Sequence, residues 1–239
     1  MFQLRAMAEP RPNSSAASSA AARAPDAPGA SVARLAASQL RRMRRIVDAA
    51  VRLAEKGGFE AVRLRDVAEA SDVALGTLYK YFRSKEDILL FALTEEVERL
   101  EAAMASRPVE GRTAVERIAS CFRRCTNALV RRPDFARAVV RSIASGDPEL
   151  TAKVAGFHLR MTRIILAALR SEPLVASDAD AGEPGSEGER QLATMLQHVW
   201  FASLAGWAAG LHPARAVSEQ VELAAALVLS PSREIRALI

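Results

Sequence analysis

The spacing of apolar residues constrains this chain most, because it follows the helical period along nearly the whole length. A clear stripe is formed by Val115, Ile118, Phe122, Cys125 and Leu129, which recur every three or four residues. Of the 239 residues, 50% are hydrophobic but only 5% are aromatic, so a substantial core can form while strand formers are scarce. The sequence therefore predicts an all-α fold.

Charge and cysteine content narrow the class of protein. The formal net charge is +5, which permits a nucleic-acid partner. The two cysteines lie four residues apart, so a disulfide framework is not expected. The first residues hold no apolar run typical of a signal peptide, and no uninterrupted apolar stretch is long enough to cross a membrane. We expect a soluble protein of the cytoplasm.

The chain divides into a tail, a helical head and a larger helical body. Residues 1–33 are rich in Ala, Ser and Pro without a hydrophobic period, which predicts a disordered tail. A solvated tail is the simpler interpretation, and an arm that touches DNA through Arg5, Arg11 and Arg23 is the alternative. We assign residues 34–84 to the head and residues 85–239 to the body.

Three helices are expected in the head. The first covers residues 34–56 and ends at Gly57-Gly58, since glycine readily takes the left-handed conformation that terminates helices. The second covers residues 64–70, and the third covers residues 74–82 after a tight turn. Two short helices joined in this way form a helix-turn-helix, in which the second helix enters the major groove of DNA.

The segment from Val73 to Lys85 reads Val-Ala-Leu-Gly-Thr-Leu-Tyr-Lys-Tyr-Phe-Arg-Ser-Lys, and it closely resembles the DNA-binding domain of the TetR family of bacterial regulators. The resemblance covers about residues 40–92. It implies an N-terminal three-helix DNA-binding domain and a C-terminal helical ligand-binding and dimerisation domain, about nine helices in all. Arg63 and Ala74 depart from the pattern, because Ser or Thr commonly caps the second and third helices there.

The predicted DNA-binding residues lie on the second and third helices and just beyond them. Gly76 lets the backbone approach base edges, and Thr77 offers a methyl or a hydroxyl group to them. Lys80 can reach a guanine edge, and phosphate contacts are expected from the tyrosines and from the last lysine. The full predicted set is Arg65, Leu75, Gly76, Thr77, Tyr79, Lys80, Tyr81 and Lys85. Leu78 and Phe82 are assigned to the core.

The body is expected to hold six further helices and one flexible acidic loop over residues 172–189. The helices are predicted at about residues 85–104, 113–132, 133–145, 150–168, 188–211 and 214–229. The resemblance implies that the last two helices pair with their copies in a homodimer. A two-fold dimer would read two half-sites of palindromic operator DNA.

Large apolar side chains in the body are candidates for a ligand cavity between helices, and ordinary core packing is the alternative for each. The predicted ligand-binding residues are Phe122, Cys125, Phe157, Met161, Trp200 and Leu204, with Trp207 beside them. Residues 105–170 carry thirteen Arg and Lys against five acids, a balance of +8. Solvated helix faces explain part of this charge, and an anionic effector such as an acyl-CoA explains more, because guanidinium groups bind phosphate in bidentate fashion.

The sequence from His198 to Trp207, together with the head, is similar to the actinobacterial repressors of sterol catabolism, which implies a lipid-like or CoA-linked effector. Cys121, Cys125 and His158 lack a fourth metal ligand, so no metal and no cofactor are expected. The histidines have no nucleophile in a recognisable catalytic motif, so the chain is not expected to be an enzyme. The alternative to a DNA-binding repressor is an effector-free helical interaction module whose basic surface binds acidic proteins or membranes.

Overall fold

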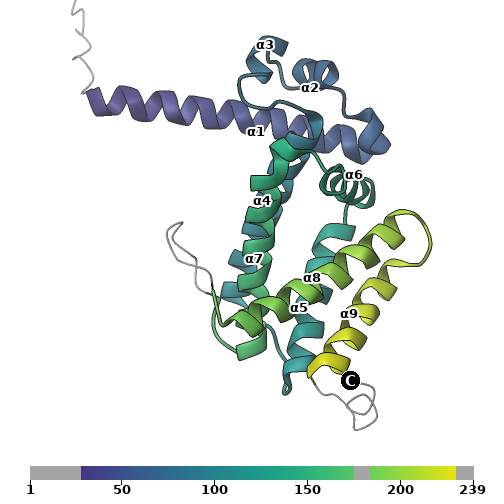
Figure 1. Cartoon of the computed structure of the whole chain (residues 1–239). Helices are drawn as coiled ribbons and strands as arrows, with labels where there is room; N and C mark the ends of the chain where they lie inside the picture. Colours follow the sequence, from purple (N-terminus) through teal and green to yellow (C-terminus); the bar gives the residue numbers. More distant parts are fainter. Residues whose placement is uncertain (1–27, 175–183, 230–239) are drawn as a thin grey trace, which may run out of the picture. The chain divides into compact units, whose positions relative to one another are not determined.

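The computed structural model describes residues 28–174 and 184–229 (Figure 1). Within these two ranges every regular element is helical, with nine α-helices and one short 3-10 helix, which confirms the predicted all-α class. Contacts divide the chain into two units, residues 1–39 and 40–239, and the packing given below is that of the second unit. None of the helices in the described ranges is long and apolar enough to span a membrane.

Helix α1 runs from Pro28 to Ala61 and begins earlier than predicted. Residues 28–33, which the sequence analysis assigns to the tail, are helical; a proline is tolerated in a first turn, and two of these six residues are the good helix former alanine. The rest of the predicted tail, with Arg5, Arg11 and Arg23, lies outside the described residues. At the other end the backbone breaks at Gly57 and Gly58, as predicted, and Gly58 has a φ of 65°.

Helix α2 covers Leu64–Ala70, as predicted, but helix α3 covers only Leu75–Leu78. The expected helix over residues 74–82 is therefore too long. The amides of Lys80 and Tyr81 bond to carbonyl oxygens three residues back, at 3.2 and 2.9 Å, so the chain tightens after the first turn. Neither α2 nor α3 begins with a side-chain cap, as the departures at Arg63 and Ala74 predicted.

The hydrophobic core of the head is formed by side chains from all three of its helices and from the segment that follows them. Ile46 and Val47 of α1 lie in one buried cluster with Val67 of α2 and Leu78 of α3. Phe82 is also buried, and its ring meets that of Phe91 edge-on with the centroids 5.6 Å apart. The assignment of Leu78 and Phe82 to the core is confirmed, and their burial fixes which side of α3 remains free.

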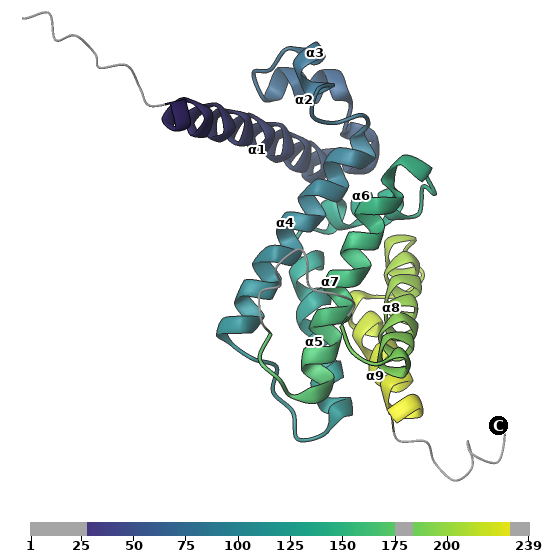
Figure 2. The same ribbon diagram turned by 60° about the vertical axis from the view of Figure 1, so that its left-hand side comes forward.

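The body is a bundle in which α5 packs against both α7 and α9, while α8 packs along α9 (Figure 2). Its helices are α4 (Lys85–Ser106), α5 (Ala114–Val130), α6 (Pro133–Ile143), α7 (Thr151–Arg170), α8 (Glu187–Ala208) and α9 (Ala214–Leu229), with the 3-10 helix η1 at Pro148–Leu150. Trp200 of α8 donates a buried 2.9 Å hydrogen bond from its indole Nε1 to Thr126 of α5. The division of the chain at residue 84 stays a prediction.

Helix α8 begins at Glu187, inside the loop predicted over residues 172–189, because a capping box stabilises its first turn. The Ser186 hydroxyl accepts from the Glu189 amide, and the Glu189 carboxylate accepts from the Ser186 amide at 2.8 Å. Arg170 of α7 holds the same carboxylate with two hydrogen bonds of 2.8 and 2.6 Å. Hydrogen bonds from Arg170 and Ser186 lower the pKa of Glu189 from 4.5 to about 2.

We expect the first turn of α8 to loosen in acid. Because the pKa of Glu189 is lower in the folded chain, its stabilising contribution is complete above pH 4.5 and is lost as the pH falls towards 2. Amide protection factors of residues 187–190, measured by hydrogen exchange, should fall over that interval. In a Glu189→Gln variant this pH dependence should weaken to the part that comes from Glu187, whose pKa is also lowered by hydrogen bonds from Gln191 and Arg190. An unchanged profile would contradict the assignment.

Candidate functional site

One side of α3 is exposed to solvent, and the opposite side is buried in the core of the head. Leu78 has no exposed surface, whereas Gly76, Tyr79 and Lys80 are exposed, with 52% of Tyr79 accessible. Arg65 on the neighbouring α2 is exposed as well, and α2 packs against α3. Four of the predicted DNA-binding residues are thus exposed, Arg65 on α2, Gly76 on α3, and Tyr79 and Lys80 in the turn directly after α3.

Gly76 is not required by the fold. A Cβ atom built at this position meets no atom within 4 Å, and the residue lies inside α3 without a positive φ. Alanine would be the better helix former there. An exposed glycine without a structural reason supports the predicted close approach of the backbone to a partner.

The remaining predicted residues are less accessible, and two of them have partners. Leu75 and Thr77 are half-buried on α3. The hydroxyl of Tyr81 accepts from Nη1 of Arg42 on α1 at 3.4 Å. Arg42 belongs to an arginine-rich stretch at residues 34–45, and its contact to Tyr81 places it beside the end of the helix-turn-helix, which no sequence motif indicated.

Lys85 differs from the other predicted DNA contacts, because its ammonium group already has several partners within the protein. Its Nζ donates to the Phe59 carbonyl at 3.3 Å and lies 3.6 Å from the Glu60 carboxylate. The same nitrogen lies 3.8 Å from the centroid of the Phe59 ring. A phosphate would have to compete with all three contacts for this lysine.

Replacing Arg65 with alanine should relax sequence preference without affecting the fold. Its side chain is exposed, and loss of a bidentate contact to guanine removes about 1–3 kcal/mol of discrimination at one base pair. Selection from a random DNA pool would show the lost preference as one degenerate position in each half-site. Arg52→Ala, which removes an exposed arginine of α1, is the control, and identical selected sequences for the Arg65 variant would contradict the prediction.

In the body, a small apolar cavity of about 30 Å³ lies between α4, α5, α7 and α8. Four of the predicted ligand-binding residues meet in its wall, namely Cys125, Phe157, Met161 and Trp200. The other two do not line it. Phe122 is fully buried with its ring centroid 5.7 Å from that of Trp200, and Leu204 is 2% exposed, so both are core residues in this structure.

A larger hollow of about 730 Å³ adjoins this cavity and shares three lining residues with it, Glu96, Leu100 and Ala128. We call it the arginine groove, because five of its lining residues are Arg99, Arg107, Arg124, Arg131 and Arg132. Glu96 pairs with Arg99 at 2.9 Å and with Arg132 at 3.2 Å. Among the lining residues one carboxylate therefore faces five guanidinium groups, which leaves the groove cationic.

The thiol of Cys125 is not activated. A hydrogen bond with Cys121 and burial together raise the pKa of Cys125 well above its ordinary value. Cys125 is therefore a neutral thiol at physiological pH, and it forms part of the apolar cavity wall. Within the described ranges no group of three or more His, Cys, Asp or Glu side chains could hold a metal ion.

Comparison with known proteins decides the family. Residues 46–91 match the model of the bacterial regulatory proteins of the tetR family, and residues 111–228 match a tetracyclin repressor-like C-terminal domain. The HTH-type transcriptional repressor KstR of Rhodococcus jostii (strain RHA1) is 34% identical over 192 residues, covering 80% of this chain and 84% of its own length. The chain belongs to the TetR family.

Solved structures agree with a TetR fold. A TetR transcriptional regulator from Rhodococcus sp. RHA1 superposes with a TM-score of 0.69 at 21% identity, covering 81% of this chain and 98% of the other. Thermus thermophilus FadR, solved in complex with lauroyl-CoA, has a TM-score of 0.56 at 25% identity, covering 78% and 93%. The predicted family and the resemblance to the sterol-catabolism repressors are confirmed, and these relatives are regulators of transcription.

Proposed function

We propose that this TetR-family chain is a repressor that binds palindromic operator DNA as a homodimer and is released from it by a CoA thioester. Such a protein is not a catalyst and acts in the cytoplasm, where bacterial DNA lies. The observation that carries the effector half of the proposal is the junction of an apolar cavity with a cationic groove in the body.

The DNA half of the proposal is supported by the free side of α3. Gly76 is exposed on α3, Tyr79 and Lys80 are exposed directly after it, and Arg65 is exposed on α2. A backbone, an aromatic ring and two cationic side chains are therefore accessible together. These groups suit base edges and phosphates in a major groove. Membership of the TetR family favours the regulator over an effector-free interaction module.

The proposed homodimer is supported by apolar side chains on the last two helices. Leu223, Leu227 and Val228 of α9 and Met195 of α8 are exposed, although they are large and apolar. On α9, Leu223 and Leu227 lie one turn apart with Val228 next to Leu227, and an exposed apolar patch of this kind marks a protein interface. A symmetric contact between copies would bury them and set the separation of the two α3 helices.

The effector half of the proposal has a physical requirement. The apolar cavity, at about 30 Å³, has room for about one water molecule, so an acyl chain can enter only if helices separate. A ligand that demands such a rearrangement binds one arrangement of the body better than the other, which is the condition for an effector. The arginines of the groove would hold the CoA phosphates just outside.

A gel-shift assay with the DNA upstream of the protein's own coding sequence tests the proposal, because such regulators often lie beside what they control. We expect a retarded complex with two protomers, which is dissociated by lauroyl-CoA and not by free CoA. Native mass spectrometry of the purified protein should give the dimer mass and reveal any ligand carried through purification. Equal affinity for the upstream fragment and a scrambled one would overturn the regulator function.

A further inference from the structure

Two cations meet one aromatic ring and one carboxylate where the head joins the body. Nζ of Lys85 lies 3.8 Å from the centroid of the Phe59 ring, and Cζ of Arg141 lies 4.4 Å from it. Oε1 of Glu60 forms an ion pair with Nη1 of Arg141 at 2.8 Å, and Oε2 lies 3.6 Å from Nζ of Lys85. We call Phe59, Glu60, Lys85 and Arg141 the Phe59 clamp.

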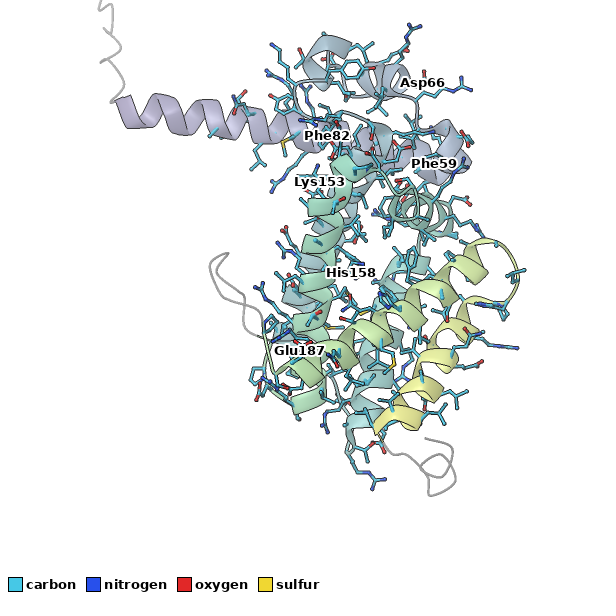
Figure 3. All side chains as sticks on the ribbon, in the orientation of Figure 1. Phe59, Asp66, Phe82, Lys153, His158 and Glu187 are labelled. Carbon is cyan, nitrogen blue, oxygen red and sulfur yellow. The ribbon has the colours of Figure 1, made fainter. Side chains whose placement is uncertain are left out.

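The clamp joins three separate elements. Phe59 and Glu60 follow the Gly57-Gly58 break in α1, Lys85 is the first residue of α4, and Arg141 lies in the last turn of α6 (Figure 3 labels Phe59). Of the four residues, Arg141 is the one furthest along the chain and the one that α6 contributes. The contact therefore ties α6 to the segment that leads into α2.

The position of that segment decides where the DNA-reading helices lie. The backbone between the helical part of α1 and the start of α2 turns through Gly58, whose φ of 65° is one that other residues rarely adopt. A glycine pair is an easy place for a chain to bend. The ring and carboxylate held by the Phe59 clamp lie directly after it, so the clamp restrains this bend.

Helix α6 also reaches the arginine groove, at its other end. Arg132, the residue before its first turn, lines the groove and pairs with Glu96 at 3.2 Å and with Glu55 at 3.0 Å. Glu96 lines both the groove and the apolar cavity. A single helix of 11 residues thus begins at the proposed effector site and ends at the Phe59 clamp.

We propose that Arg141 is the positioning residue through which the body determines where α2 and α3 lie, with α6 as the rigid link. Phosphate entering the groove competes with Glu96 for Arg132, so the start of α6 shifts and Arg141 withdraws from Glu60. The displacement of α6 by an effector rests on the proposed function. The restraint of the Gly57-Gly58 bend by the Phe59 clamp does not depend on it. The clamp belongs to the arrangement that binds DNA, and its loss favours the released one.

A second set of contacts between head and body does not involve α6. Glu149 of η1 pairs with Arg83 of the head at 3.0 Å. The buried carboxylate of Asp87 on α4 accepts from the Arg83 amide at 3.0 Å and pairs with Lys153 of α7. Figure 3 shows Lys153 and Phe82 near the start of α4. These contacts keep the head attached when Arg141 withdraws, so release would reorient the head without unfolding it.

The test compares Arg141→Ala with Arg137→Ala, which removes an exposed arginine one turn earlier on the same helix. Arg137 pairs with Asp134 of α6 and lies over the Trp207 ring, so it contacts only the body. Hydrogen exchange of the full-length protein without DNA is the first measurement. Arg141→Ala should lower the protection of residues 59–70 about tenfold, and Arg137→Ala should leave it unchanged.

Binding to DNA selected from a random pool by the wild-type protein is the second measurement. Arg141→Ala should weaken it about tenfold at an unchanged salt slope, because no phosphate contact is lost. Lauroyl-CoA should then release less of the remaining complex. If the wild type selects no DNA, the proposed function fails, and hydrogen exchange still decides the Phe59 clamp.

Glu60→Gln, which keeps the side-chain shape and removes both ion pairs, guards against a folding defect in the arginine variant. It should reproduce the loss of protection with a melting temperature near that of the wild type. Unchanged protection of residues 59–70 in both variants would overturn the proposal. So would a reduced salt slope in Arg141→Ala, since that result would make the residue a phosphate contact.

Discussion

Replacing Gly76 with glutamate will abolish operator binding and leave the protein folded. The new side chain meets no atom of the chain within 4 Å of its Cβ, so the helix accepts it. In the major groove it would place a negative charge among phosphates, and a like-charge contact costs about 3 kcal/mol or more, which is over a hundredfold in affinity. Fluorescence anisotropy with labelled operator measures the loss, and a thermal melt reports folding.

Gly156→Glu is the matched control for this variant. Gly156 is exposed in the middle of α7, and a Cβ there also meets nothing within 4 Å. The two variants carry the same change of charge and the same gain in helix propensity. Operator affinity should stay at the wild-type value for Gly156→Glu, and the same value for Gly76→Glu would remove α3 from the DNA interface.

Reversing two charges of the arginine groove should remove the response to a CoA thioester. Arg107 and Arg131 are exposed groove residues, and hydrogen bonds to charged groups contribute about 1.5–3 kcal/mol each. Arg107→Glu combined with Arg131→Glu should weaken lauroyl-CoA binding at least about a hundredfold. Titration calorimetry measures the affinity, and a gel shift should show operator binding that lauroyl-CoA no longer releases.

Two comparisons separate the groove from total charge and from the apolar cavity. Arg123→Glu changes an exposed arginine of α5 outside the groove, and it should retain wild-type affinity for lauroyl-CoA. Dodecanoic acid lacks the CoA phosphates, so its binding should be the same in the double variant and the wild type. Equal loss of dodecanoic acid binding would show that the double variant had damaged the cavity.

Local signals in the sequence predicted most of the helices. Helices α2 and α9 have the predicted bounds because apolar spacing and flanking turn residues agree there. Helix α3 is shorter than predicted, since periodicity records that Leu78 and Phe82 share a buried side but not that the chain tightens between them. Helix α8 begins within one residue of the predicted start, where Ser186 and Glu189 form a capping box, and it ends three residues before the predicted end.

The candidate site residues were predicted only in part, because the sequence does not show which helix faces pack against each other. The sequence identified the apolar stripes that hold Cys125, Phe157, Met161 and Trp200, but it does not say which stripe faces a cavity and which faces another helix. Phe122 lies on the same helix as Cys125 and is core. The partners of Lys85 were not predicted, because its contacts to Phe59 and Glu60 form only when the helices pack.

Because α3 is only one turn long, we expect repression to depend steeply on the concentration of the protein. One turn, Leu75–Leu78, gives each protomer few side chains with which to hold a half-site. A lone protomer would then dissociate quickly, and stable occupancy would require two at once. Below the dimerisation constant, promoter silencing would follow the square of the intracellular protein level, so a modest fall in synthesis would switch the controlled genes on sharply.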